Sequence, residues 1–370
     1  MSEKSENSTS LNAADFVMGD PLAKFLVIRR KWSPLQVGLL AYLWAISSSL
    51  VIALIGGTLQ RGTGYVALVE DYLYLISETA LIPTLWGYYT WMIAAPVRVF
   101  SELAESKVYM PTAKEIDATR KILGRRWQTP VSLFLAVIIG VVYFMQHQVM
   151  SVPFWFATNP ILLGIRTALV IVPTGFITWS SVFRYIANTR LFRHSLSDVH
   201  IHPLHPDRAG GLRPLGRYAL STTYIIALGG SVVALAEYYA WTHGTFSTAY
   251  YYHVALILYF ILAPANFFAP LSSAHNAMQR AKDDLILRIS RQFNQDFSKA
   301  YSELEGSAEE LKDHIEKIEQ LQRLHSMTNS FPVWPFDIDT IRRFVLTMTS
   351  PVFTVAVAVI INVLTNMLTQ

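Results

Sequence analysis

The chain of 370 residues contains no cysteine and has few charged residues. Without thiols it cannot form a disulfide framework, a thiolate metal site or a cysteine nucleophile. Only 15% of its residues are charged and 52% are hydrophobic, whereas about a quarter of the residues in a soluble domain are charged. Because so little charge is available for a water-facing surface, we expect most of the chain to lie in a lipid bilayer.

The N-terminus also lacks an early hydrophobic segment. It begins MSEKSENSTSLNAADF, which is polar and does not resemble a cleaved signal peptide. The sequence therefore predicts a flexible cytoplasmic tail over residues 1–33.

Long apolar stretches follow this tail. A membrane-spanning helix needs about 20 mostly apolar residues. Stretches of this kind lie near 36–57, 73–96, 130–150, 161–185, 217–240, 249–270 and 347–368. The fold class predicted from them is an all-α polytopic membrane bundle of about seven transmembrane helices, six of them within 34–270.

Lysine and arginine are concentrated in alternate connections between these stretches. The basic residues in these connections and at the span ends beside them include, up to residue 217, Lys24, Arg29, Arg30, Lys31, Arg98, Lys107, Lys114, Arg120, Lys121, Arg125, Arg126, Arg184, Arg190, Arg193, Arg208, Arg213 and Arg217, and 271–346 adds ten more. The other connections hold only Arg61. The positive-inside rule thus predicts a cytoplasmic N-terminus and cytoplasmic segments at 97–129, 186–216 and 271–330. The net charge of +4 is attributed to the membrane surface, and no nucleic-acid partner is expected.

The segment 271–330 is the largest predicted cytoplasmic element. Apolar residues recur at steps of three and four over 274–327, which is typical of an amphipathic helix. Glu305-Gly306-Ser307 can end one helix and begin another, which favours a helical hairpin or coiled coil. Two interpretations stay open, a rigid stalk and a surface for oligomerisation or for a cytoplasmic protein partner. Residues 331–370 are predicted to be a membrane re-entry anchor, FPVWPFD, followed by the final transmembrane helix.

The cytoplasmic stretch DVHIHPLHPDRAGGLRPLG, residues 198–216, is the densest group of chemically versatile side chains. Three interpretations stay open for it. His200, His202, His205 and Asp207 form a donor set suited to Zn²⁺, Fe²⁺ or Mn²⁺. Arg208, Gly210, Gly211 and Arg213 offer guanidinium groups and backbone amides to an anion. The structural alternative is a proline-stiffened turn that binds nothing.

Four ionisable residues lie within or beside the apolar stretches. Glu78, Arg166 and Glu237 are inside them and His253 is close by. An unpaired charge in a bilayer costs at least a few kcal/mol, so we expect Arg166 to pair with Glu237 or Glu78. The functional alternative is a cluster that responds to protons or ions.

An HPD-x-x-GGL loop (His205 to Leu212) combined with a late WPFD motif (Trp334 to Asp337) resembles a set of uncharacterised bacterial multi-pass membrane proteins. This resemblance implies a bacterial inner-membrane location and no mechanism. No complete catalytic set is evident, so no catalytic residue is assigned. We predict a channel-like or signalling membrane assembly that contacts membrane lipids and forms homo-oligomers. The alternative is a metal-dependent membrane hydrolase of lipid-linked or phosphorylated substrates that uses the histidine loop.

Overall fold

The computed structural model describes residues 13–17, 19–60, 62, 64–109, 116, 121, 126–149, 153–196, 199, 201, 207, 209–242, 250–302 and 308–368. Within these ranges all regular elements are helices, and an isolated bridge joins Val66 to Phe154. The predicted all-α fold is confirmed for this part of the chain.

The helices follow the predicted apolar stretches closely. In chain order they are α1 (Pro21–Ala23), η2 (Lys24–Arg29), α2 (Pro34–Gly56), η3 (Leu68–Glu70), α3 (Tyr72–Ile76), η4 (Ser77–Leu81), α4 (Ile82–Glu105), α6 (Gln128–Gln148), α7 (Pro160–Arg166), η5 (Thr167–Ile171), α8 (Val172–Ser195), α9 (Arg213–Thr242), α10 (Tyr250–Phe268), α11 (Ser272–Ser302), α12 (Ala308–Asn329), α13 (Ile338–Met348) and α14 (Ser350–Leu368).

Four described helices are long and apolar enough to cross a membrane, or up to six if each of two bent pairs forms one span. The four are 34–56, 128–148, 160–195 and 213–242, and the bent pairs are 253–268 with 272–302 and 338–348 with 350–364. The predicted span at 73–96 is not among them. Tryptophan and tyrosine replace many aliphatic residues there, which lowers the mean hydropathy of this stretch. Outward-facing apolar side chains on α2, α6 and α14 give the bundle the surface of a membrane protein.

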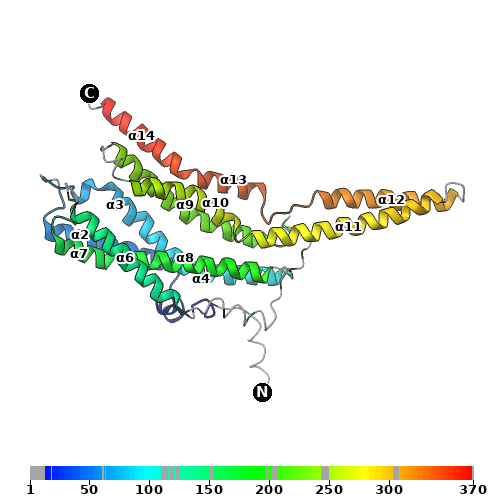
Figure 1. Ribbon diagram of the computed structural model, residues 1–370, viewed down its shortest axis with the longest axis horizontal. Coiled ribbons are helices and arrows are strands. Elements are labelled where there is room, and N and C mark those ends of the chain that lie inside the picture. Colours follow the sequence, from blue (N-terminus) through cyan, green and yellow to red (C-terminus); the bar gives the residue numbers. More distant parts are fainter. Residues whose placement is uncertain are drawn as a thin grey trace, which may run out of the picture.

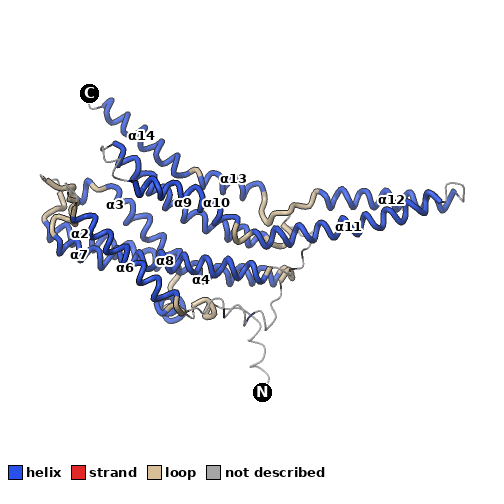
Figure 2. Tube along the Cα trace, in the orientation of Figure 1, coloured by secondary structure: helices blue, strands red, loops and turns tan. Residues whose placement is uncertain are grey.

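The helices run roughly along the long axis of the molecule (Figures 1 and 2). Helices α2 and α4 pack together, as do α6 and α8, and α4 joins the two pairs through α8. Helix α9 packs on α4 and carries α10, α13 and α14 on its other sides. The core therefore has two layers, with α4 and α9 at their interface.

Helices α11 and α12 form a hairpin that extends beyond one end of the bundle (Figure 1). Lys282 donates to the carbonyl oxygen of Asn329 at 2.7 Å, and the ring Nδ1 of His314 lies 3.8 Å from a carboxylate oxygen of Asp296. These two pairs have nearly the same sum of residue numbers, which identifies an antiparallel arrangement. The predicted break at 305–307 lies outside the described residues, between the ends of α11 and α12.

The segment 13–32 differs from the expected flexible tail, because it is folded against the bundle. Phe16 and Val17 are buried in the main hydrophobic core. Asp20 caps α1, and its other carboxylate oxygen accepts hydrogen bonds from the Arg184 guanidinium at 2.9 Å and the Tyr89 hydroxyl at 2.5 Å. Arg184 is itself 8% exposed, so Asp20 supplies the charge that makes its burial favourable and holds the segment in place.

Candidate functional site

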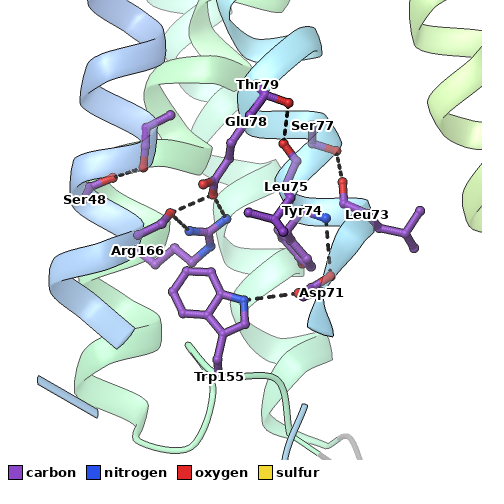
Figure 3. Close-up of polar contacts among 12 residues, drawn as sticks. Ser48, Asp71, Leu73, Tyr74, Leu75, Ser77, Glu78, Thr79, Trp155 and Arg166 are labelled. Atoms are coloured by element: carbon purple, nitrogen blue, oxygen red, sulfur yellow. Dashed lines mark hydrogen bonds and ion pairs between the residues drawn. The ribbon is translucent and has the colours of Figure 1, made fainter. Parts of the chain in front are cut away.

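A buried ion pair joins two of the four ionisable residues singled out in the sequence. Glu78 on η4 and Arg166 at the end of α7 are each 1% exposed, and their side chains meet at 2.5 Å. Ser49 on α2 completes the contact, since its hydroxyl donates to Glu78 and accepts from Arg166, both at 2.7 Å. Figure 3 shows the Arg166 guanidinium held between Glu78 and the Trp155 ring. Three elements are thereby tied together at one point.

Both residues of the ion pair lie at π-helical turns. Glu78 is the second residue of η4, and Arg166 immediately precedes η5. Each turn is followed by a proline, Pro83 or Pro173, which lacks the N–H that a regular helix would use. The wider π-helical turn accommodates the backbone hydrogen bond that proline cannot donate, and such turns often occur at functional positions. The similar stretches 78–84 (ETALIPT) and 166–174 (RTALVIVPT) produce the same local structure twice.

Aromatic rings enclose the arginine. The guanidinium carbon lies 4.6 Å from the Trp155 ring centroid, 4.9 Å from Phe156 and 5.0 Å from Tyr74. Cation–π contacts of this kind stabilise a desolvated cation. Glu78 balances the charge of Arg166, and the aromatic rings stabilise its guanidinium group. The ion pair therefore holds α2, η4 and α7 together.

Asp71 supports this enclosure from just outside α3. One carboxylate oxygen accepts from the Trp155 indole N–H at 3.2 Å, and the other accepts from the Tyr74 backbone N–H at 3.3 Å (Figure 3). Burial raises the pKa of Asp71 to about 7, although these two hydrogen bonds act in the opposite direction. Asp71 is therefore a titratable group at the end of the bundle opposite the hairpin.

Asp71 should make the stability of the protein fall as pH rises from about 4 to about 7. In this window the folded state keeps a proton on Asp71 that the unfolded chain, with a pKa near 3.8, has released. The limiting slope for one proton is about 1.4 kcal/mol per pH unit. Asp71→Asn should remove this slope, measured as the thermal unfolding midpoint in detergent against pH. The exposed Asp284→Asn on α11 is the control, and an unchanged slope in Asp71→Asn would contradict the assignment.

The other two ionisable residues form a separate pair. Glu237 on α9 contacts the Nδ1 atom of His253 on α10. Of the two acidic residues expected as partners of Arg166, Glu78 is the one that pairs with it. The four residues do not converge on one cluster.

Asp207 organises the described part of the histidine loop. Its carboxylate accepts from the backbone N–H groups of Ala209 at 2.9 Å, Gly211 at 3.0 Å and Arg213 at 3.3 Å. Gly210 and Gly211 have φ values of +64° and +89°, which side chains rarely tolerate. Of the two glycine amides proposed for an external anion, the Gly211 amide thus donates to a carboxylate of the same loop.

The remaining residues of the two loop hypotheses are outside the described residues, namely His200, His202, His205 and Arg208. Among described residues, no group of three histidine, aspartate or glutamate side chains is placed to hold a metal ion. The metal and anion hypotheses therefore stay predictions.

The loop packs against the base of the hairpin and the WPFD segment. We call this contact region the junction, made of Gly210, Arg213, Gly216, His275, Met278, Phe331, Trp334, Pro335 and Asp337. A Cβ atom on Gly210 would lie 3.4 Å from the Phe331 ring and 3.9 Å from Met278, and one on Gly216 would lie 2.5 Å from the carbonyl oxygen of Pro335. Such close approaches show that glycine lets the first turn of α9 touch the backbone of the WPFD segment.

Polar and stacking contacts complete the junction. Arg213 lies 3.2 Å from Asp337, and Asp337 also caps α13. The His275 ring stacks on Trp334 with centroids 4.0 Å apart, and its Nδ1 atom lies 2.8 Å from the carbonyl oxygen of Val333. His275 was not predicted as a site residue, because it lies 58 positions from its partner in a stretch with no motif. Arg213 and Gly216, which follow the HPD-x-x-GGL motif, therefore contact the WPFD segment directly.

No protein-family model, curated protein or solved structure matches the chain.

Proposed function

We propose that this chain is a signalling membrane assembly of channel-like type, in which the cytoplasmic hairpin and histidine loop sense a ligand or partner and pass the signal to the membrane helices. The observation that carries the proposal is the junction. It joins the base of the hairpin, the loop before α9 and the segment before α13 in one packed unit. A displacement of the hairpin is thus directed into the membrane helices that begin there.

The continuity of the helices supports this coupling. Helix α11 follows α10 with a bend of 46°, and α14 follows α13 with a bend of 47°. Phe267 on α10 stacks on Phe344 of α13 with centroids 4.2 Å apart. A movement of α11 therefore reaches α13 through α10 and the stacked rings of Phe267 and Phe344. A signal would act by shifting the equilibrium between two arrangements of this unit.

The proposal includes seven spans with the N-terminus in the cytoplasm of a bacterium. The seven are 34–56, 72–105, 128–148, 160–195, 213–242, 250–268 and 350–368. Helices α10 and α14, with 19 residues each, are about 28 Å long, close to the thickness of the bilayer core. Arg98, Arg193 and Arg213 lie toward the helix ends on the side of the hairpin, and Lys282 lies on the hairpin itself, which supports a cytoplasmic hairpin.

Ion flux through purified protein in liposomes, at varied pH and voltage, tests the proposal. We expect flux that Trp334→Ala changes at least several-fold, because this substitution removes the stacking on His275 in the junction. Trp127→Ala, just before α6, is the control, since Trp127 packs on the ring of Phe183, which is not part of the junction. Absence of flux under all conditions, or equal effects of both variants, would contradict the proposal.

Elemental analysis of the purified protein tests the competing proposal of a metal-dependent hydrolase. That proposal requires stoichiometric zinc, iron or manganese that is lost in His202→Ala and His205→Ala. We expect a protein whose metal content those substitutions do not change.

A further inference from the structure

The segment before the first membrane-spanning helix carries a cluster of cations on its outer face. Four basic residues of this segment are exposed, and we call them the basic face: Lys24, Arg29, Arg30 and Lys31. The inner side of the same segment is apolar, and Leu26 is buried in the main hydrophobic core. The segment is therefore fixed to the bundle by its apolar side and presents its charges outward.

No acidic residue of the segment offsets the basic face. The sequence contains no aspartate or glutamate between Asp20 and Glu70, and Asp20 itself pairs with Arg184 at 2.9 Å. Among the described residues, no ion pair involves any of the four cations. The basic face thus has a strong positive charge that an external anion can neutralise.

The basic face lies at the level where two membrane-spanning helices begin. Ser33 is the N-cap of α2, directly after the segment. The Thr129 hydroxyl, in the first turn of α6, donates to the carbonyl oxygen of Gly19 at 2.6 Å, so the segment (dark blue in Figure 1) also lies against the start of α6. Leu35 in the first turn of α2 is 82% exposed, so the apolar outer surface begins immediately beyond the cations. In a bilayer this level is the headgroup layer.

Aromatic rings accompany the cations. The guanidinium carbon of Arg30 lies 5.4 Å from the centroid of the Phe25 ring. The Phe25 ring, which is exposed, in turn contacts the Trp32 ring edge-on with centroids 6.4 Å apart. Tryptophan is enriched at the boundary between lipid and water, where one part of the ring meets acyl chains and the N–H meets polar groups. The rings therefore suit the same headgroup layer as the cations.

Lys31 adopts a backbone conformation that favours glycine. Its φ is +56°, and it directly follows Arg30, the C-cap residue of η2. Helices commonly end in glycine at this position, because a Cβ atom is sterically disfavoured there. The Trp32 N–H donates to the carbonyl oxygen of Leu26 at 3.1 Å and closes the turn. A lysine in this conformation indicates that its side chain has a use that offsets the backbone strain.

We propose that the basic face binds the anionic headgroups of phospholipids in the leaflet from which α2 starts. Lipid phosphates lie at the level of these cations, so they reach the basic face without a channel, and a soluble polyanion would have to displace them. Each lysine or arginine beside an anionic membrane surface adds to the attraction, and a guanidinium group can hold a phosphate through two hydrogen bonds. The inference requires that α2 crosses the membrane and is independent of a signalling role.

Native mass spectrometry of the whole chain in detergent measures this binding. We expect added phosphatidylglycerol to bind at least tenfold more tightly than phosphatidylcholine. The triple variant Arg29→Gln/Arg30→Gln/Lys31→Gln should reduce this preference at least tenfold, because it removes three of the four cations. Its thermal unfolding midpoint without added lipid checks that it is folded.

A second triple variant is the matched control. Arg288→Gln/Arg291→Gln/Lys317→Gln removes the same charge from exposed positions on the hairpin and should keep the full preference for phosphatidylglycerol. Excess inorganic phosphate should leave the lipid bound, because free phosphate lacks the acyl chains that hold a headgroup at this level. Equal binding of the two lipids, equal losses in both triple variants, or displacement of the lipid by phosphate would overturn the inference.

Lys31→Gly separates a lipid contact from a role in the fold. The unfolding midpoint should change little, because relief of the strained φ offsets the greater freedom of glycine in the unfolded chain. The affinity for phosphatidylglycerol should fall about fivefold, the effect of one cation near an anionic surface. An unchanged affinity would overturn the assignment of Lys31 to the lipid. Lipid binding is measured without ion flux, so this inference and the proposed function fail separately.

Discussion

Arg166→Met is expected to lower the free energy of unfolding by about 3–5 kcal/mol, the cost of breaking a buried ion pair by removing one partner. Methionine fills much of the same space, so the loss comes mainly from the carboxylate of Glu78, which is 1% exposed and would keep Ser49 as its described partner. The cation–π contacts with Trp155, Phe156 and Tyr74 would also be lost. The measurement is the thermal unfolding midpoint of the detergent-solubilised protein.

Two further variants separate charge from packing at this site. Arg193→Met removes an exposed arginine from α8 and should change stability by no more than about 0.5 kcal/mol. The double variant Glu78→Gln/Arg166→Met removes both charges and should recover at least half of the loss, because no ion is left unpaired. If the double variant is as unstable as Arg166→Met, then packing dominates and the ion-pair account is wrong.

Gly216→Val should destabilise the protein by about 3 kcal/mol, at the upper end of the usual cost of overpacking, and should loosen the junction. A Cβ atom on Gly216 would lie 2.5 Å from the carbonyl oxygen of Pro335 and 3.4 Å from Phe336. The first of these neighbours is backbone, so α9 and the WPFD segment must move apart. Hydrogen exchange should rise in α13 and at the base of α11, and the unfolding midpoint should fall.

The same helix offers a matched control for this substitution. Gly229 also lies in α9, and a Cβ atom there would meet nothing within 4 Å. Gly229→Val should be neutral or slightly stabilising, because valine has a better helix propensity than glycine. Similar losses in both variants would show that α9 needs glycine for a reason other than the junction.

Several features of the fold follow from the chain composition and periodicity. Apolar stretches of sufficient length predict helices over five of the seven expected spans within a few residues, as at 36–57 and 130–150, which the structure has as Pro34–Gly56 and Gln128–Gln148. The expected second span runs on to Glu105 instead of ending near 96. The expected fourth span likewise runs on to Ser195 instead of ending near 185. Both ends are poorly marked in sequence because scattered apolar residues such as Val99, Phe100 and Leu191 continue beyond the apolar stretches and are buried.

The candidate site was less predictable from the sequence than the positions of the helices. Because a charge in a bilayer is costly, the sequence predicts that Arg166 pairs with an acidic residue. It does not distinguish Glu78 from Glu237 as that partner. Only the packing of α7 against α2 and η4 selects Glu78. A local signal was present in the paired stretches ETALIPT and RTALVIVPT, whose prolines demand similar turns. The folding of residues 13–32 had no such signal, because Asp20 and Arg184 meet only in three dimensions.

The sequence alone determined that this chain is helical and suited to a membrane, because length and hydrophobicity act locally along the chain. Tertiary structure decided which charges pair and how α9 reaches the WPFD segment. These features depend on contacts between residues 88 to 164 positions apart, as for Arg166 with Glu78 and Arg184 with Asp20. Loop closure over such distances carries no local preference, so only the packed bundle specifies them.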